Sequence, residues 1–188
     1  MSILLRFRWI CLFVACLLVG CATTSKPLEV SYEASSNQTT YETRQMRLDD
    51  IKMTTGLERD NRFYVRISGS CLGQDCVPKK YTMSFIKEGT QSVRIEGRDV
   101  RLTVGTETMT WDDPQSRDVT RTSSIRSGTF AKINLTSQQL TTVGSVRSVS
   151  GTVGGSSFSI PHDTRAPIRK LLSELGKDPN SGSDQSSS

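Results

Sequence analysis

Histidine is almost missing from this 188-residue chain, in which His162 is the only one. A conventional zinc centre draws its ligands from histidine and cysteine, so a single histidine leaves too few donors. A serine–histidine–aspartate site needs a serine held in a sharp turn, and the sequence lacks the G-x-S-x-G pattern. His162 stands beside Asp163 between a predicted strand and a predicted helix, as an exposed turn residue would. We therefore expect a protein that is not an enzyme and that holds no metal or cofactor.

The sequence also lacks an apolar run long enough to cross a bilayer. Its longest run, 10–19, is well below the roughly 20 residues that a transmembrane helix needs. Arg6 and Arg8 precede this run and small residues follow it, which is the layout of a secretory signal peptide. Residues 1–20 are therefore predicted to be a leader that is removed on export.

The end of this leader reads Leu18-Val19-Gly20-Cys21, which resembles the lipobox of bacterial lipoprotein precursors. The resemblance implies cleavage between Gly20 and Cys21 and attachment of lipid to the Cys21 sulfur. Ala22 follows the cysteine, where an aspartate would imply retention in the inner membrane of a Gram-negative cell. The resemblance thus implies a lipoprotein anchored in the outer membrane and facing the periplasm.

Cysteine usage agrees with export. Cys11 and Cys16 belong to the leader and Cys21 to the lipobox, which leaves Cys71 and Cys76 in the sequence SCLGQDC. An oxidising compartment predicts a disulfide between these two, because their spacing differs from the C-x-x-C of redox centres and further metal ligands are lacking.

Basic residues outnumber acidic ones only modestly, at 24 against 19, which gives a net charge of +5. The arginines alternate with acids and do not form one block, so no nucleic-acid partner is expected. A basic strand face could still meet an anionic envelope glycolipid or another envelope protein. The candidate surface residues for such binding are Arg62, Tyr64, Arg66, Arg94 and Arg101.

Apolar and polar side chains alternate along many segments, as in half-buried strands of antiparallel sheets. Such strands are predicted at 41–54, 63–68, 81–85, 91–111, 126–135, 145–153 and 156–160. Segment 41–54 changes parity at Asp49-Asp50, which predicts a bulge. Glycines predict hairpin turns at Gly97-Arg98, Gly105-Thr106 and Gly154-Gly155, so 91–111 is expected to be a three-stranded meander.

Near the C-terminus, Ile168, Leu171, Leu172 and Leu175 line one face of a predicted helix. We expect Asp163 or Thr164 to cap it, Gly176 to end it, and the helix to cover one end or an open edge of the sheets. The predicted fold is mainly β: an antiparallel β-sandwich or a partly open β-barrel with one C-terminal amphipathic helix.

Four parts are expected along the chain. These are the leader at 1–20, a flexible tether at 21–40, the β domain at 41–175 and a disordered tail at 176–188. The expected function is that of a lipid-anchored, non-catalytic binding or assembly module of the bacterial envelope. Two alternatives stay open: an envelope hydrolase that uses carboxylates, and a carrier of a small ligand or lipid with an internal cavity.

Overall fold

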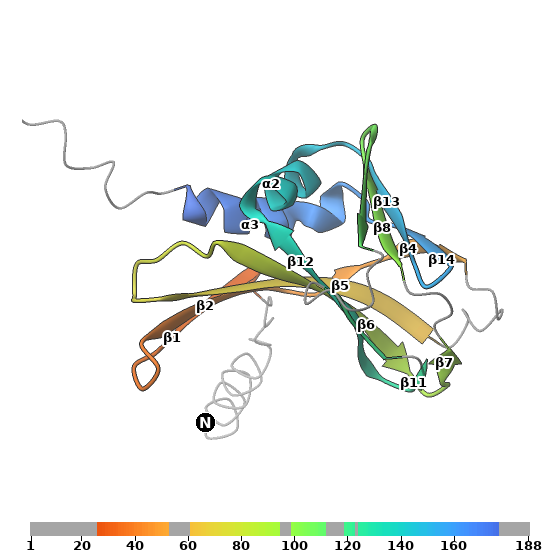
Figure 1. Cartoon of the computed structure of the whole chain (residues 1–188), viewed down its shortest axis with the longest axis horizontal. Coiled ribbons are helices and arrows are strands. Elements are labelled where there is room, and N and C mark those ends of the chain that lie inside the picture. The colour runs from red at the N-terminus through yellow and green to blue at the C-terminus, as the bar shows by residue number, and fades with distance from the viewer. Residues whose placement is uncertain (1–25, 53–60, 95–98, 112–118, 123, 177–188) are drawn as a thin grey trace, which may run out of the picture.

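The computed structural model describes residues 26–52, 61–94, 99–111, 119–122 and 124–176. Its main element is a seven-stranded antiparallel sheet, called here the large sheet (Figure 1). The strand order is β1-β2-β5-β6-β12-β10, and the short β3 pairs with β5 beyond the end of β2. The bounds are β1 Leu28–Glu33, β2 Gln38–Thr43, β3 Met46–Arg47, β5 Asn61–Leu72, β6 Lys80–Gly89, β10 Val119–Arg121 and β12 Gly128–Thr136.

A second sheet of five strands, the small sheet, has the order β4-β14-β13-β8-β9. Its strands are β4 Asp49–Lys52, β8 Val100–Val104, β9 Glu107–Trp111, β13 Val149–Val153 and β14 Ser156–Ser159. The remaining strands, β7 Val93–Arg94 and β11 Ser124–Ile125, pair only with each other. Within the described residues the strands form separate sheets and no closed barrel, so the fold is mainly β and sandwich-like.

Two helices cover one face of the large sheet: α2 (Ser137–Ser145) and α3 (Ala166–Leu175). Figure 1 shows both helices above the sheet, with most of the small sheet on the same side. Thr136 ends β12 and caps α2, because its hydroxyl accepts a hydrogen bond from the Gln139 amide at 3.2 Å. The Gln139 side chain accepts one from the Thr136 amide at 2.8 Å, which completes a capping box. None of the helices in the described segments is long and apolar enough to cross a membrane.

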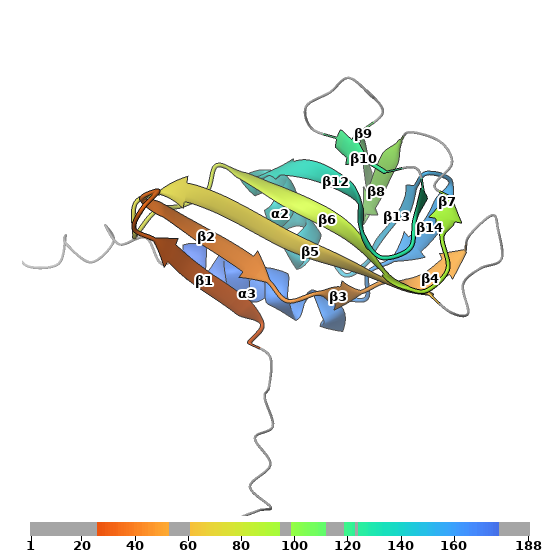
Figure 2. The ribbon, with the colours of Figure 1, turned by 90° about the horizontal axis from the view of Figure 1, so that it is seen from below.

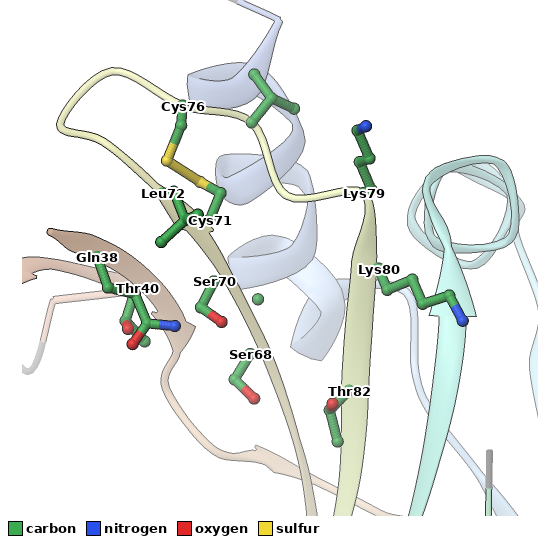
Figure 3. Close-up of a pocket in the computed structure, with 12 residues that line it drawn as sticks. Gln38, Thr40, Ser68, Ser70, Cys71, Leu72, Cys76, Lys79, Lys80 and Thr82 are labelled. Atoms are coloured by element: carbon green, nitrogen blue, oxygen red, sulfur yellow. A yellow bond between two sulfur atoms is a disulfide. The ribbon is translucent and has the colours of Figure 1, made fainter. Parts of the chain in front are cut away.

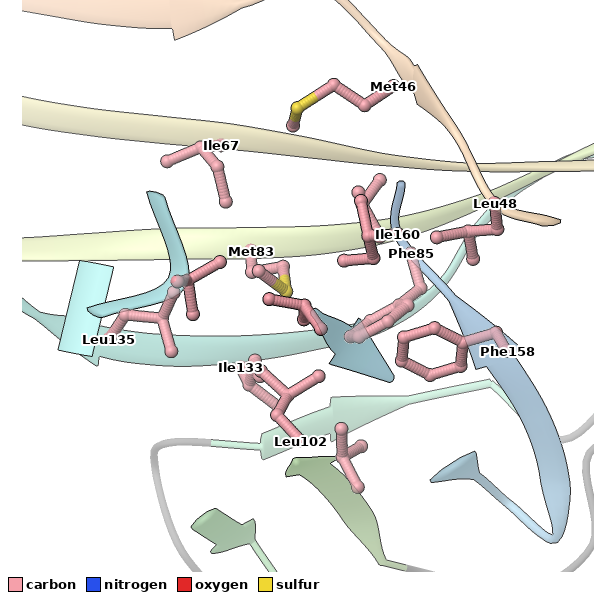
Figure 4. Close-up of a cluster of buried hydrophobic side chains, with 14 of the residues drawn as sticks. Met46, Leu48, Ile67, Met83, Phe85, Leu102, Ile133, Leu135, Phe158 and Ile160 are labelled. Atoms are coloured by element: carbon pink, nitrogen blue, oxygen red, sulfur yellow. The ribbon is translucent and has the colours of Figure 1, made fainter. Parts of the chain in front are cut away.

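The core lies between the large sheet and this covering layer (Figure 4). Along β5, alternate side chains from Phe63 to Ile67 are buried, which is the period of two that the sequence shows. Phe85 of β6 meets Phe158 of β14 with the ring centroids 5.4 Å apart, so aromatic packing joins the two sheets. Trp111 of β9 makes a further link, because its indole nitrogen donates to the Asn134 carbonyl of β12 at 3.2 Å.

Two cationic side chains are buried among these apolar ones, Lys87 and Arg165, and both are 0% exposed. The Lys87 amine donates hydrogen bonds to the carbonyl oxygens of Arg126 and Gly89. Burial lowers the pKa of Lys87, because the charged amine has lost its water. Burial, followed by the nearby charge of Arg169, likewise lowers the pKa of Arg165.

Several predicted turns are confirmed. Gly105 joins β8 to β9, and Gly154-Gly155 joins β13 to β14; all three glycines have positive φ angles. Asp50 also has a positive φ of 52°, and the pairing of β4 with β14 shifts register there, as expected for a bulge. The Gly97-Arg98 turn lies outside the described residues.

Other predictions are wrong. The expected flexible tether contains β1 and the start of β2, so the folded domain begins at Leu28 and not at residue 41. The meander is also wrong, because β7 pairs with β11 and leaves β8 and β9 as a hairpin of the small sheet. The leader, Cys21 and residues 177–188 lie outside the described residues.

The C-terminal helix α3 is confirmed, although it covers a face of the large sheet, where one end or an open edge was expected. Neither Asp163 nor Thr164 caps it. Those residues form a short 3-10 helix, η1 (Asp163–Arg165), and the residue that precedes α3 is Arg165, which makes no side-chain cap. Gly176 stands at the end of α3, as predicted.

Candidate functional site

The face of the large sheet opposite α2 and α3 is called here the open face. Figure 2 looks onto it, with the helices behind the strands. Alternation along β5 places Arg62, Tyr64 and Arg66 on this face, together with Ser68 and Ser70. Three of the five predicted surface residues are therefore brought together on one strand.

The other two predicted surface residues lie elsewhere, so the five do not share one surface. Arg94 belongs to β7, outside the large sheet. Arg101 belongs to β8 of the small sheet, and its guanidinium is paired with Asp99 at 2.9 Å. The parity of a strand predicts which of its residues share a face, but it does not predict which strands share a sheet.

The open face is hollowed where β5 and β6 separate. Their pairing ends at Ser68 opposite Thr82, and beyond this point the disulfide loop connects the two strands. The hollow has a volume of about 760 Å³ (Figure 3). It is lined by Gln38, Thr40, Ser68, Gly69, Ser70, Cys71, Leu72, Cys76, Val77, Lys79, Lys80 and Thr82.

The predicted disulfide between Cys71 and Cys76 is confirmed, with the two Cα atoms 5.8 Å apart. Its loop is held by side chains of β2. The Thr39 hydroxyl donates to the Gly73 carbonyl at 2.5 Å, and the Tyr41 hydroxyl donates to the Cys76 carbonyl at 2.9 Å. Because these bonds and the disulfide fix the loop, the wall of the hollow is preformed.

A second hollow, of about 360 Å³, lies further along the open face. Its lining is Arg66, Ser68, Thr82, Ser84, Thr120, Thr129, Lys132 and Asn134. Ser68 and Thr82 line both hollows, so the two adjoin, and together they are called here the sheet groove.

The sheet groove is basic, and its lining mixes polar side chains with the exposed apolar side chains of Leu72 and Val77. Among its described lining residues, four are cationic (Arg66, Lys79, Lys80 and Lys132) and none carries a carboxylate. Arg66 is paired with Glu42 of β2 at 2.7 Å, whereas the three lysines form no ion pair within the described residues. The groove therefore offers positive charge to a ligand together with many hydroxyl groups.

Sequence reasoning identified only one of these four cations, Arg66. The lysines were missed because their grouping depends on the pairing of β5, β6 and β12. Lys132 lies opposite Ser84, and Lys80 lies opposite Thr136. The pair Lys79-Lys80 directly after a disulfide loop was the one signal available in the sequence.

The acids that a hydrolase would need are scattered over the described part of the chain. Asp49 is paired with Arg47 at 3.7 Å, and Asp50 accepts a hydrogen bond from Ser159 at 2.9 Å. His162 lies exposed, 3.5 Å from Asp163. The Asp112-Asp113 pair lies outside the described residues. Among the residues that the structure describes, no three histidine, cysteine or acidic side chains gather as metal ligands would.

A hollow lined by apolar side chains lies between the sheets, where Leu48, Phe63, Phe130 and Phe158 meet. Its volume is about 10 Å³, which is too small for an acyl chain. The sheet groove is thus the larger and more accessible candidate site.

Comparisons with protein-family models, with curated proteins and with solved structures found no match for this chain.

Proposed function

We propose that this protein is a lipid-anchored, non-catalytic binding module of the bacterial envelope that uses its open face as the binding surface. The observation that carries the proposal is the sheet groove, a preformed basic depression on a sheet face that α2 and α3 leave uncovered. A binding module needs a shaped surface and no reactive group, and the lining of the groove fits that requirement.

The lipid anchor is proposed from the leader and the Leu18–Cys21 lipobox. The Cys71–Cys76 disulfide supports an oxidising location, as expected after export. Since β1 begins at Leu28, only residues 22–27 would separate the lipidated cysteine from the folded domain. Even fully extended, such a spacer reaches about 25 Å, so the domain would stay near the membrane surface.

The two alternative functions receive less support. The scattered carboxylates do not suggest a hydrolytic pair, and the 10 Å³ apolar hollow does not suggest a lipid carrier.

Fractionation of cells tests the anchor. The unaltered protein should sediment with membranes, whereas Cys21→Ser should appear in the soluble exported fraction. Cys11→Ser changes a leader cysteine and serves as the matched control, which should remain with membranes. A Cys21→Ser variant that still sediments with membranes would reject lipidation.

Site-specific photo-crosslinking in living cells tests the binding face. A crosslinking side chain at Ser70, which is exposed in the sheet groove, should give adducts with envelope components. The same side chain at Ser173, exposed on α3, is the control and should give none. Equal adducts at both positions would mean that the open face is not the binding surface.

A further inference from the structure

We propose that the sheet groove binds the phosphorylated saccharide headgroup of an envelope glycolipid. This inference rests on the proposed function and names the ligand class of the same site. It follows from the charge, the hydrogen-bonding groups, the spacing of the cations and the lack of aromatic side chains in the described lining.

Charge comes first. Lys79 and Lys80 stand at one end of the groove, and Lys132 stands further along it, across Ser84 from Arg66. Glu42, on the neighbouring strand, is the carboxylate that contacts this set, and its charge is matched by Arg66 at 2.7 Å. The lysine charges remain to attract an anion, and primary amines are common phosphate binders.

The spacing of the cations suggests a ligand with two anionic groups. Lys80 and Lys132 lie opposite Thr136 and Ser84, which places them four residues apart along neighbouring strands. At the rise of a β-strand this separation is about 13 Å. An oligosaccharide with a phosphate near each end would give each of these two amines its own anionic partner.

Hydroxyl and amide groups fill the space between the cations. Ser68, Thr82 and Asn134 line the middle of the groove, and the Thr82 hydroxyl lies 3.2 Å from the Asn134 side-chain oxygen. Serine and threonine hydroxyls both donate and accept hydrogen bonds, as sugar hydroxyls do. This middle part of the groove suits a polar, hydroxylated ligand, while Leu72 and Val77 add apolar surface at the end near the disulfide.

The lining also argues against other anions. Single-stranded nucleic acid is held by stacking of its bases on aromatic rings, and protein interfaces concentrate energy in aromatic anchors. No aromatic residue occurs among the described lining residues of either hollow, because Tyr64 on the same face lies outside them. A saccharide carrying phosphates can be bound through its anionic groups and hydroxyls without a stacking platform.

With the proposed lipid on Cys21, the spacer 22–27 keeps the groove near the envelope membrane.

Binding of the Cys21→Ser protein, purified from the soluble exported fraction without its leader, to lipid vesicles tests the inference. One set of vesicles carries lipopolysaccharide, a second carries enzymatically dephosphorylated lipopolysaccharide, and a third carries phosphatidylglycerol at equal surface charge. We expect binding to the first set to exceed binding to the other two by about tenfold, because the phosphates that pair with the lysines are lost or differently placed in the other two sets. Inorganic phosphate alone should compete only weakly.

Lysine substitutions test whether lipopolysaccharide binds in the sheet groove. Lys80→Gln combined with Lys132→Gln should weaken binding to lipopolysaccharide vesicles about tenfold or more. Lys170→Gln on α3 is the matched control, because it removes one exposed lysine from the opposite side, and it should change binding less than twofold. Unaltered melting temperatures would show that all three substitutions leave the fold intact.

Four results would overturn the inference. These are equal binding to dephosphorylated lipopolysaccharide, equal binding to phosphatidylglycerol, full competition by single-stranded DNA, and a double variant that binds like the parent. The crosslinking and fractionation experiments keep the proposed function separate. If Ser70 still gives adducts while lipopolysaccharide fails to bind, the groove remains a binding site and only its ligand class is wrong.

Discussion

Arg165 donates a hydrogen bond from its guanidinium to the main-chain carbonyl of Arg147, at 2.9 Å, across 18 positions of the sequence. A second bond goes to the carbonyl of Val143 within α2. Arg165 directly precedes α3, and its side chain thus binds main-chain carbonyls at and just beyond the C-terminal end of α2. A cation is favourable there, because the unpaired carbonyls at a helix C-terminus carry partial negative charge.

Arg165→Met should therefore lower the free energy of unfolding by about 2 kcal/mol, because it leaves two buried carbonyls without their donor. Arg165→Lys keeps the charge but has no planar fork, and should fall between Met and the parent. Urea denaturation measures both. A methionine variant as stable as the parent would mean that dehydration of the guanidinium cancels the benefit of its hydrogen bonds.

Gly151 of β13 cannot accept a larger residue. A Cβ atom there would overlap the carbonyl oxygen of Arg101 on β8 and would lie 2.8 Å from the Phe158 ring. Gly151→Ala should lower the free energy of unfolding by about 3 kcal/mol, since a backbone atom cannot move aside as a side chain can. Ser150→Ala, at an exposed neighbouring position, is the control and should melt like the parent.

Reduction or removal of the disulfide should have a modest effect on stability. The Cys71–Cys76 loop is short, and replacement of both cysteines by alanine should cost about 2 kcal/mol. Intact mass with and without reductant should differ by two hydrogen atoms for the unaltered exported protein. Two free thiols in that protein would contradict the cross-link.

Lys87 predicts a pH dependence of stability. Its pKa is lowered by burial, so the folded protein releases this proton at a pH at which the unfolded chain, near 10.5, still holds it. Between the lowered pKa of the folded state and the pKa of the unfolded chain, the unfolded state binds more protons. In that pH range the contribution of Lys87 to the free energy of unfolding therefore rises with pH.

Lys87→Met removes the titrating amine and isolates this effect. The parent should gain stability relative to the variant as the pH is raised from 7 towards 10, in urea titrations at each pH. The stability difference between the two proteins would stay constant with pH if Lys87 titrated normally in the folded state.

The parts of the fold that local pattern determines were predictable. Alternation identified β5, β6 and β8, and glycines with positive φ angles identified the β8–β9 and β13–β14 turns. The helix α3 followed from its apolar stripe. Each of these elements shows its buried face within its own sequence.

The missed elements have weak local signals. Only Leu28 of β1 is buried, so an edge strand made of exposed residues was interpreted as a tether. In α2 the buried side chains are few, and threonines are common. The Thr136–Gln139 capping box was the signal that could have located this helix.

The candidate site was predictable only along one strand. Arg62, Tyr64 and Arg66 share a face by parity alone. The lysines of the sheet groove converge because β6 pairs with both β5 and β12, and because β5 and β6 separate after Ser68. Such pairings join distant parts of the chain, and a single sequence does not reveal them.

The link between Trp111 and Asn134 also gives the protein an intrinsic optical reporter. The chain contains two tryptophans, and the other, Trp9, lies in the proposed leader. Once that leader is cleaved, all indole emission would come from Trp111, which lies at the contact between the small sheet and the large sheet. A spectral shift would then reveal separation of the layers directly, without any attached dye.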